Sequence, residues 1–411
     1  MINKYSKIVK EYCCNNYQGL FRNPDGLLKY PFIVPGDCYG QELWDWDSWL
    51  TNIALRQIVP EVEELFTYEK GSVLNFLVNT DDDGKMPIMI KADGYNLGYK
   101  CDDETNMHKP CIAQHIAFII KNTSDDTSWF KAHFEKLEKF LFRYKKKNQH
   151  SCGLYFWTDD FMIGVDNEPC TFYRPNNSSG SIYLNCLMYK ELLAMAFICE
   201  KIEYGDKKDY YINEAKNLKK SILQHCWDER MGFYFSVDLN LLPFDDTTWL
   251  HKGGPRHWDC LIQRIEVWTG FMSLWAEIAT REQAERIVKE HFYNEKTFSS
   301  PYGICSLSKM EKMYAVRKSG NPSCWLGPIW GISNYMVFSG LLKYGYEKEA
   351  REIAEKTVLM FGRDIENCGK MHEYYDPETG EPVHNIGFQS WNLLVLNMIA
   401  YLEDNKRIEE F

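Results

Sequence analysis

Helix-length apolar segments alternate along the chain with six long polar stretches, and strand-like alternation of apolar and polar residues is rare and short. Apolar positions that recur every three to four residues predict twelve helices. The predicted helices lie near residues 2–15, 45–58, 61–78, 108–122, 127–146, 181–204, 208–226, 265–279, 281–291, 324–344, 346–361 and 389–404. The sequence therefore predicts an all-α fold.

The connections between the predicted helices differ greatly in length. Tight turns near 279–283 and 343–347 each join two helices, and Gly345 suits the left-handed conformation that ends a helix. The long stretches are rich in Gly, Pro and aromatic residues and cover 19–43, 80–106, 148–180, 228–263, 293–322 and 363–388. Loops of this length inside a compact domain usually carry function.

Six helical hairpins separated by six long loops predict an (α/α)6 barrel. In such a barrel the inner helices surround an axis, and we expect the long loops to gather at one mouth. No Ser-, Gly- or Pro-rich linker divides the chain, so we expect residues 1–411 to form a single domain.

Charge and apolar patterning argue against several classes of partner. The formal net charge of −11 repels phosphate backbones, so we expect no nucleic-acid partner. The first residues lack an apolar signal region, and no run approaches the roughly 18 apolar residues of a membrane span, so we expect a soluble, cytoplasmic protein. The 14 cysteines form no CxxC motif, and we expect free thiols, no metal and no cofactor. The oligomeric state is left open.

Two carboxylates are the strongest catalytic candidates, although 58 of the 411 residues are Asp or Glu and most of them simply face solvent. Asp166 lies in Gly164-Val165-Asp166-Asn167-Glu168-Pro169, and Glu373 lies in His372-Glu373-Tyr374-Tyr375-Asp376-Pro377. Aromatic rings crowd both segments, and apolar surroundings keep a carboxyl group protonated near neutral pH. Cleavage of a glycosidic bond needs one acid and one base of this kind.

Further segments are candidates for binding a sugar, because aromatic rings stack on sugar faces and polar groups bind hydroxyls. The chain is 15% aromatic, with 13 Trp and 26 Tyr. The candidate substrate-binding residues are Trp44, Trp46, Asp47, Lys109, Gln114, Asn167, Trp325, Trp330, Gln389 and Trp391. For each of them a structural role is the alternative: helix capping for Asp47, a solvent-facing position for Lys109, and core packing for one Trp of the Trp325/Trp330 pair.

The motifs together resemble those of glycoside hydrolase family 63 and its trehalase relatives. Glu42 to Trp49 resembles their WDS-type segment, Lys109-Pro110 their KP segment, and Gly164 to Pro169 their GxDNxP motif. Leu326 to Trp330 resembles their RGPxW segment, and the stretch from His372 to Pro377 resembles their base motif. The resemblance runs in family order from about residue 35 to 391. It implies an (α/α)6 barrel and an inverting mechanism on α-linked sugars, with Asp166 as general acid and Glu373 as general base.

The departures from the family pattern narrow this expectation. Leu326 stands where relatives often have Arg, and the trehalase segment QWDxPxGWxP has only a poor remnant, His257-Trp258-Asp259-Cys260. A dedicated trehalase is therefore disfavoured. No additional β-sandwich domain fits in 411 residues, so the chain resembles the short bacterial members. These include α-glucosidases and hydrolases of glucosylglycerate or mannosylglycerate.

The main hypothesis is an α-glucosidase acting on small α-linked glucosides. One alternative is a glucosylglycerate or mannosylglycerate hydrolase, or a trehalase-like enzyme. A sugar epimerase or isomerase would instead use loop histidines such as His108, His251, His257 and His372. A non-catalytic sugar-binding protein would keep the aromatic cleft. The acidic segment Asp81-Asp82-Asp83-Gly84 lacks the spaced ligands of an EF-hand and predicts a turn.

Overall fold

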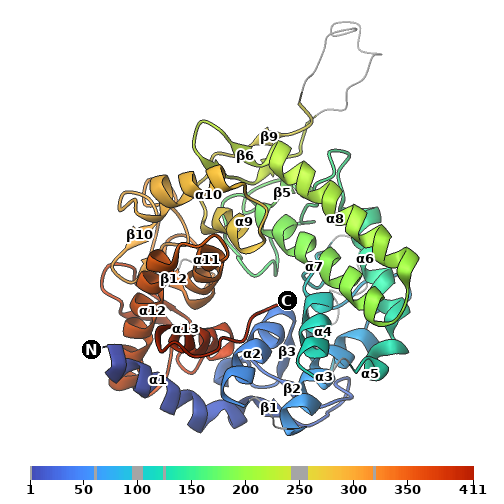
Figure 1. Ribbon diagram of the computed structural model, residues 1–411, viewed down its shortest axis with the longest axis horizontal. Helices are drawn as coiled ribbons and strands as arrows, with labels where there is room; N and C mark the ends of the chain where they lie inside the picture. The colour runs from blue at the N-terminus through green and yellow to red at the C-terminus, as the bar shows by residue number, and fades with distance from the viewer. Residues whose placement is uncertain (1, 60–62, 95–104, 124–125, 242–257, 318–320) are drawn as a thin grey trace, which may run out of the picture.

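The computed structural model describes residues 2–59, 63–94, 105–123, 126–241, 258–317 and 321–411, which form a double ring of helices around an axis (Figure 1). The inner ring contains α2 (Asp45–Ile58), α4 (Ile112–Lys121), α7 (Ile182–Lys201), α9 (Met272–Trp275), α11 (Gly331–Lys343) and α13 (Val395–Leu402). The outer ring contains α1 (Ile2–Asn16), α3 (Glu63–Val78), α6 (Phe134–Asn148), α8 (Gly205–His225), α10 (Arg281–Ile287) and α12 (Glu347–Cys368). The predicted (α/α)6 barrel is confirmed.

The ring closes through contact between the two ends of the chain. Each inner helix contacts the next, and α2 packs against both α13 and the short 3-10 helix η6 (Ser390–Leu394) that precedes it. Helix α1 packs against α12 and touches α13. In the part of the chain that the structure describes, five helix pairs are therefore hairpins, and the sixth pair joins the first and last helices. The expectation of six hairpins is therefore corrected to five, because the sixth pair consists of α1 and α13, from opposite ends of the chain.

Several predicted helices differ from the structure at their ends. The segment 265–279 forms the 3-10 helix η4 (Trp268–Phe271) before α9, and the segment 281–291 ends in a π-helical turn, η5 (Val288–Phe292). The segment 127–146 divides into α5 (Ser128–Lys131) and α6. Short 3-10 helices also occur at Tyr17–Leu20 (η1) and Asp37–Tyr39 (η2). The predicted turns are present: Gly345 has φ +82° after α11, and Gly84 has φ +85° in the acidic segment.

The burial of each helix follows its place in the double ring. In the inner helix α7, 15 of 20 residues are buried, because neighbours cover it on all sides. In the outer helix α8, the buried residues Tyr211, Ala215, Leu218 and Ile222 form one stripe at helical spacing. Among the described residues, α7 alone has the length and apolar composition of a membrane span, and 83% of that stretch is buried inside the protein.

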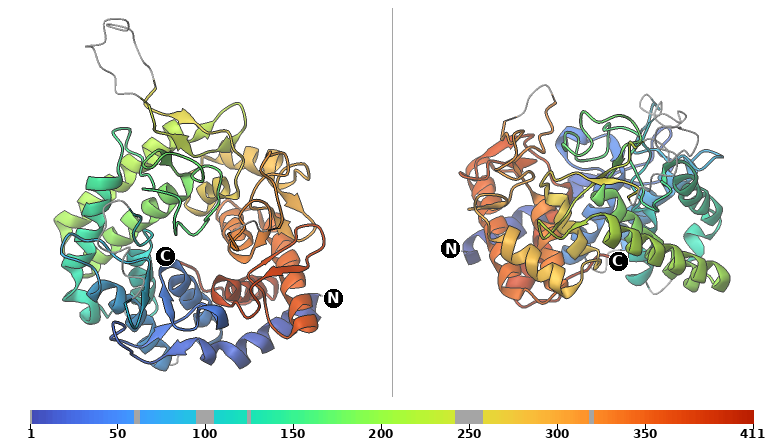
Figure 2. Two further views of the ribbon diagram at one scale, coloured as in Figure 1. Left: turned by 180° about the vertical axis from the view of Figure 1, so that it is seen from behind. Right: turned by 90° about the horizontal axis from the view of Figure 1, so that it is seen from above.

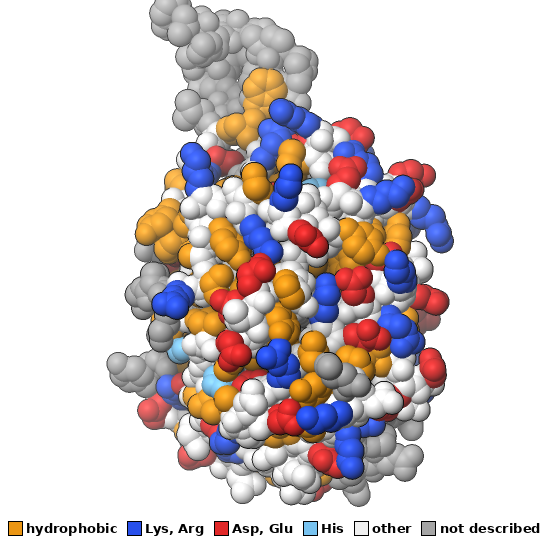
Figure 3. Space-filling view, turned by 90° about the vertical axis from the view of Figure 1, so that its left-hand side faces the viewer, with side chains coloured by type: hydrophobic (Ala, Val, Ile, Leu, Met, Phe, Trp, Pro, Cys, Tyr) orange, Lys and Arg blue, Asp and Glu red, His pale blue; other side chains and the backbone are white. Residues whose placement is uncertain are grey.

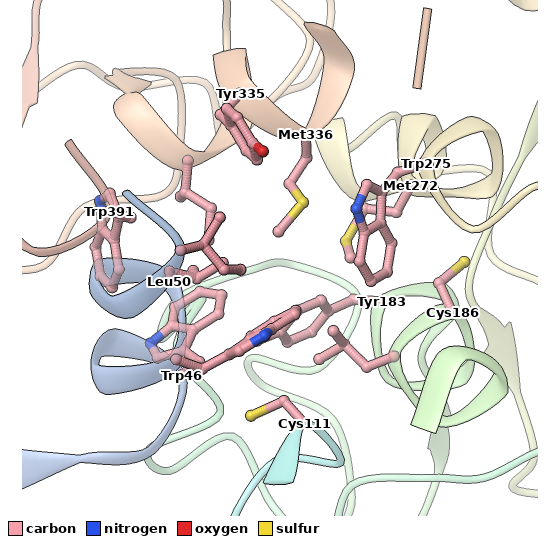
Figure 4. Close-up of a cluster of buried hydrophobic side chains, with 14 of the residues drawn as sticks. Trp46, Leu50, Cys111, Tyr183, Cys186, Met272, Trp275, Tyr335, Met336 and Trp391 are labelled. Carbon is pink, nitrogen blue, oxygen red and sulfur yellow. The ribbon is translucent and has the colours of Figure 1, made fainter. Parts of the chain in front are cut away.

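The axis of the barrel is filled by large side chains from the inner helices (Figure 4). Trp46 and Leu50 come from α2, Tyr183 from α7, Trp275 from α9 and Tyr335 from α11, and all five are nearly inaccessible to solvent. The axis is therefore a packed core and leaves room for a cavity only toward the ends of the helices. The outer side that carries α1 and α12 shows acidic and basic side chains interspersed with apolar ones (Figure 3).

Small antiparallel sheets pin the long loops, which gather on one side of the ring in the right-hand view of Figure 2. One sheet pairs β3 (Glu42–Trp44) with β4 (Met89–Lys91), and another contains β12 (Ile329–Trp330), β13 (Tyr374–Tyr375) and β14 (Pro382–His384). The remaining strands are β1 (Phe21–Arg22), β2 (Phe32–Ile33), β5 (Ser179–Gly180), β6 (Trp227–Asp228), β7 (Phe233–Tyr234), β8 (Val237–Asp238), β9 (Leu261–Ile262), β10 (Ser299–Ser300) and β11 (Gly303–Ile304). The β3–β4, β5–β8–β9 and β12–β13–β14 sheets join segments that are far apart in the sequence, whereas β1–β2, β6–β7 and β10–β11 are local pairs.

Candidate active site

A pocket of about 430 Å³ opens among the long loops. Both catalytic candidates, Asp166 and Glu373, contribute to its wall. The described lining residues are Pro35, Tyr39, Trp44, Trp46, Asp47, Lys109, Asp160, Phe161, Met162, Gly164, Asp166, Phe172, Asn321, Pro322, Ser323, Trp330, Glu373, Phe388 and Trp391. The pocket thus unites segments that span most of the chain.

The loop that carries Asp166 packs tightly against the start of α2. A Cβ atom on Gly164, whose φ is +92°, would lie 2.6 Å from the Trp46 ring and 2.7 Å from Cε of Lys109. Only glycine fits there, which is the physical basis of the glycine in this motif. Desolvation raises the pKa of Asp166, while the positive charge of Lys109 and hydrogen bonds from Ser323 and Asn321 oppose that rise.

The loop that carries Glu373 is fixed by the sheet β12–β13–β14. The backbone N–H of Glu373 donates to the carbonyl of His384, and its neighbour Tyr374 pairs with Trp330 in the sheet. Oε2 of Glu373 accepts hydrogen bonds from Nδ2 of Asn385, at 2.7 Å, and from the hydroxyl of Tyr39, at 3.4 Å. Burial raises the pKa of Glu373 to about 7, and the charge of Asp166 adds to the effect. The two carboxyls therefore influence each other's ionisation across one pocket.

Beside this loop, Asp364 of α12 holds the residues on either side of Glu373. Its carboxylate accepts hydrogen bonds from the backbone N–H of His372, at 2.9 Å, and from the Tyr375 hydroxyl, at 2.7 Å. The side chains of Asp364, Cys368 and His372 each offer a potential metal-ligand atom, and these three atoms lie within 4.8 Å of one another. Because Asp364 also contacts Nδ1 of His372, its oxygens are already engaged in fixing the loop.

A buried ion pair lies at the pocket wall, to which Lys109 contributes. Nζ of Lys109 lies 2.9 and 3.1 Å from the two carboxylate oxygens of Asp45, and 5.1 Å from the ring centre of Trp46. This pairing explains a lysine near the start of a helix, and the expected solvent-facing alternative for Lys109 is wrong. The neighbouring Asp47 accepts a hydrogen bond from the Ser390 hydroxyl at 2.7 Å, and burial raises its pKa to about 7.

Four of the predicted tryptophans line the pocket: Trp44, Trp46, Trp330 and Trp391. Trp325 does not line it, because it stacks behind Trp330 with ring centres 3.9 Å apart and ring planes 3° apart. Trp325 thus packs behind the described pocket wall, as the alternative of core packing expects, and its contact with substrate stays a prediction.

Three polar candidates also lie outside the described lining. Nε2 of Gln114, which is inaccessible to solvent, donates to the carbonyls of Pro110 and Leu187 and so joins α4 to α7. Oδ1 of Asn167 accepts a hydrogen bond from the backbone N–H of Trp325. Gln389 is buried, its backbone N–H donates to the carbonyl of Pro35, and its side-chain Oε1 has no hydrogen-bond partner among the described residues. The side chains of Gln114 and Asn167 therefore connect helices and loops, and the expected contact of all three residues with substrate stays a prediction.

The histidines expected in an epimerase are not in the described pocket wall. His108 is buried, and desolvation lowers its pKa to about 4, while His372 turns toward Asp364. His251 and His257 lie outside the described residues.

Other residues of the site carried no clear signal in the sequence. Tyr39 and Asn385 bind Glu373 from loops that are far apart in the chain, and Asn321 and Ser323 bind Asp166. The left-handed backbone of Asn385, with φ +60°, is tolerated by asparagine, but the sequence does not reveal it.

Comparison with known proteins gives one family over most of the chain. Residues 40–391 match the family described as "Mannosylglycerate hydrolase MGH1-like glycoside hydrolase domain". A cytosolic neutral trehalase of Kluyveromyces lactis is 25% identical over 267 residues, covering 61% of this chain and 32% of the relative. A probable mannosyl-oligosaccharide glucosidase of Schizosaccharomyces pombe is 21% identical and covers 71% of this chain and 34% of the relative. The chain thus spans about a third of the length of these relatives.

A solved structure matches nearly the whole length of both chains. The GH63 mannosylglycerate hydrolase of Thermus thermophilus in complex with glucose has a TM-score of 0.67 and 17% sequence identity. The match covers 97% of this chain and 98% of that one. At this identity the likeness establishes the fold.

Proposed function

The chain belongs to the family of mannosylglycerate hydrolase MGH1-like glycoside hydrolase domains, and on this premise we propose that it is an inverting hydrolase of small α-glycosides. The observation that carries the proposal is the pocket itself. The carboxyl groups of Asp166 and Glu373 come from different loops and line one cavity with aromatic walls. Desolvation raises the pKa of both groups. Glycoside hydrolysis requires such a pair, one protonated and one ionised.

In the proposed reaction Asp166 is the general acid and Glu373 is the general base. The Asp166 carboxyl gives its proton to the glycosidic oxygen as the bond to the anomeric carbon breaks. Glu373 takes a proton from a water molecule, whose oxygen attacks the anomeric carbon from the opposite face. Asn385 and Tyr39 both bind Oε2 of Glu373, so we assign the water to Oε1. We expect the two carboxyl groups to lie about 6.5–9.5 Å apart, the separation of inverting enzymes.

The glycone is proposed to be glucose. The pocket volume of about 430 Å³ suits a small glycoside, and Trp44, Trp46, Trp330 and Trp391 offer faces for a sugar ring. The two curated relatives described above bear the names trehalase and glucosidase. Among the described lining residues, Lys109 is the one lysine or arginine, and its charge is already paired with Asp45. This charge balance favours a neutral glucoside.

Hydrolysis of mannosylglycerate is the second candidate. It is favoured by the description of the matching family and by the full-length likeness to the Thermus thermophilus enzyme. The glycerate group of mannosylglycerate is negatively charged and would need a cationic partner. Among the described lining residues the one cation is Lys109, which is already paired with Asp45.

The chain is further proposed to act as one domain in the cytoplasm. The closed ring that α1 and α12 complete supports the first point, and the cytosolic relative from Kluyveromyces lactis supports the second.

The test is a substrate panel read by NMR. We expect release of β-glucose as the first anomer from one or more neutral α-glucosides, and slower release of mannose from mannosylglycerate. Release of the α anomer first would refute inversion. If mannosylglycerate is the one substrate that is hydrolysed, the proposal of a glucoside substrate fails and mannosylglycerate hydrolysis takes its place.

A further inference from the structure

Three aromatic side chains stand on the same loop as Asp166. Phe161 and Phe172 line the pocket, and Phe161 is 46% exposed. Tyr173 is 84% exposed, and its ring centre lies 4.0 Å from that of Phe172. Single exposed apolar side chains are common on protein surfaces, but a group of them beside a pocket is typical of a ligand-binding groove. We call Phe161, Phe172 and Tyr173 the aromatic rim.

The backbone holds the aromatic rim in place. The side-chain amide of Asn106 donates to the carbonyls of Asp159 and Phe161, at 3.1 and 2.9 Å. The backbone N–H of Phe172 donates to the carbonyl of Glu168. Tyr173 adopts φ +63°, a left-handed conformation that is unfavourable for a bulky residue and persists where the surrounding structure enforces it. The rim is therefore a preformed surface.

The position of the rim relative to the two carboxyls determines which part of the substrate it meets. The general acid protonates the leaving oxygen and so lies on the leaving-group side of the bond, while Glu373 lies on the water side. The rim comes from the loop of Asp166. Resting on the proposed function, we infer that the aromatic rim binds the leaving group and selects one that contains a ring, either a second sugar or an aryl group.

The chemistry of the rim favours a ring over glycerate. A pyranose or aryl ring offers a flat face to Phe161 and Phe172, whereas glycerate is a short, branched anion without such a face. Asp160, next to Phe161, also lines the pocket and repels a carboxylate. Both effects act in the same direction.

The experiment compares Phe161→Ala with a matched control, Phe142→Ala. Phe142 is 48% exposed but lies on the outer helix α6, outside the described pocket lining. The substrates are p-nitrophenyl α-glucoside, a neutral α-disaccharide and an α-glucosylglycerate. Phe161→Ala should lower kcat/KM about 2- to 12-fold on the first two substrates, the factor that corresponds to one aromatic contact. It should change glucosylglycerate less than about 2-fold, and Phe142→Ala should change none of them.

Two outcomes separate the rim from the proposed function. An equal loss on all three substrates, or no loss on any, would overturn the inference and leave the hydrolase assignment standing. If the protein hydrolyses none of the three substrates, the proposed function fails. The role of the aromatic rim is then tested by measuring ligand binding with calorimetry. In Glu373→Gln protein, p-nitrophenyl α-glucoside should bind more weakly when Phe161→Ala is added, and unchanged or undetectable binding in both proteins would overturn the inference.

Discussion

Removal of the Asn385 side chain should change the pH range in which the enzyme works while leaving the rate at high pH almost intact. Nδ2 of Asn385 donates to Oε2 of Glu373 at 2.7 Å, and this bond lowers the pKa of Glu373 against the opposing effect of burial. Glycine is the best replacement, because the backbone here has φ +60° and glycine adopts it without strain.

The magnitude follows from the strength of one hydrogen bond to a charged group. Such a bond contributes about 1.5–3 kcal/mol, and 1.36 kcal/mol corresponds to one pH unit. Because the Tyr39 hydroxyl still binds the same oxygen, we expect the lower end, an upward displacement of about one pH unit in the acidic limb of kcat/KM. The pKa of Glu373 in the unaltered protein is about 7, and a general base must be ionised. The loss should therefore be about tenfold at pH 6 and less than about 1.2-fold at pH 9.

The assay is kcat/KM on one α-glucoside between pH 5 and pH 9, expressed as the ratio of variant to unaltered protein. The ionisation of Asp166 enters both profiles and largely cancels in this ratio. Asn177→Gly is the control, because Asn177 also has a left-handed backbone, with φ +61°, but is exposed and outside the pocket lining. A loss of equal size at every pH would refute the reasoning, since it would indicate a misplaced loop.

Four further predictions follow from the same contacts. Asp166→Asn and Glu373→Gln should each lower kcat by about 100-fold or more with the circular dichroism spectrum unchanged, and full activity in either would exclude its assigned role. Glu373→Gln should also stabilise the fold above pH 7 by about 3 kcal/mol, because folding raises the Glu373 pKa from 4.5 to about 7 and so disfavours the charged form; the gain in Tm should vanish near pH 4.5. Lys109→Met should destabilise the protein by about 3–5 kcal/mol in urea denaturation by leaving Asp45 buried and unpaired, and Asp45→Asn in the same chain should restore part of it. Gln114→Leu should lower stability by about 1–3 kcal/mol with KM unchanged, whereas a raised KM would place Gln114 in contact with substrate.

The fold was largely predictable because the spacing of apolar residues reports directly which face of a helix is buried. The structure has α2 at Asp45–Ile58, the range that the sequence predicts. The helix predicted at 324–344 begins too early. Trp325, Ile329 and Trp330 fit the apolar pattern of a helix, but the chain there forms a loop, in which Gly327 has φ +152°, and a strand. Closure of the ring by α1 and α12 depends on contact between segments that are distant in the sequence, and local sequence patterns carry no information about such contacts.

The candidate site was predictable by segment but less so by residue. In a chain with this many aromatic and polar loop residues, the residue type alone does not separate the pocket wall from the packing behind it. Trp325 and Trp330 illustrate this, since they stack face to face and only Trp330 lines the pocket. Asn385 and Tyr39 were missed for the converse reason: their role depends on loops that meet only in the folded chain.

Backbone conformation just before the inner helices α2 and α11 accompanies the position of two candidates in the pocket wall. Trp44 and Trp330 immediately precede α2 and α11 in extended conformations, with φ/ψ of −104°/148° and −109°/140°, and both line the pocket. Gln389 immediately precedes η6 but has φ/ψ of −115°/−70°, and it is buried and outside the described pocket lining. Gln114 lies inside α4, and its side chain donates to the carbonyls of Pro110 and Leu187. An extended backbone does not by itself place a residue in the site, because Ser181, which precedes the inner helix α7 with φ/ψ of −68°/126°, is buried and caps that helix by accepting a hydrogen bond from the backbone N–H of Leu184. Whether the residue before an inner helix reaches the pocket therefore depends on tertiary contacts as well as on its own backbone.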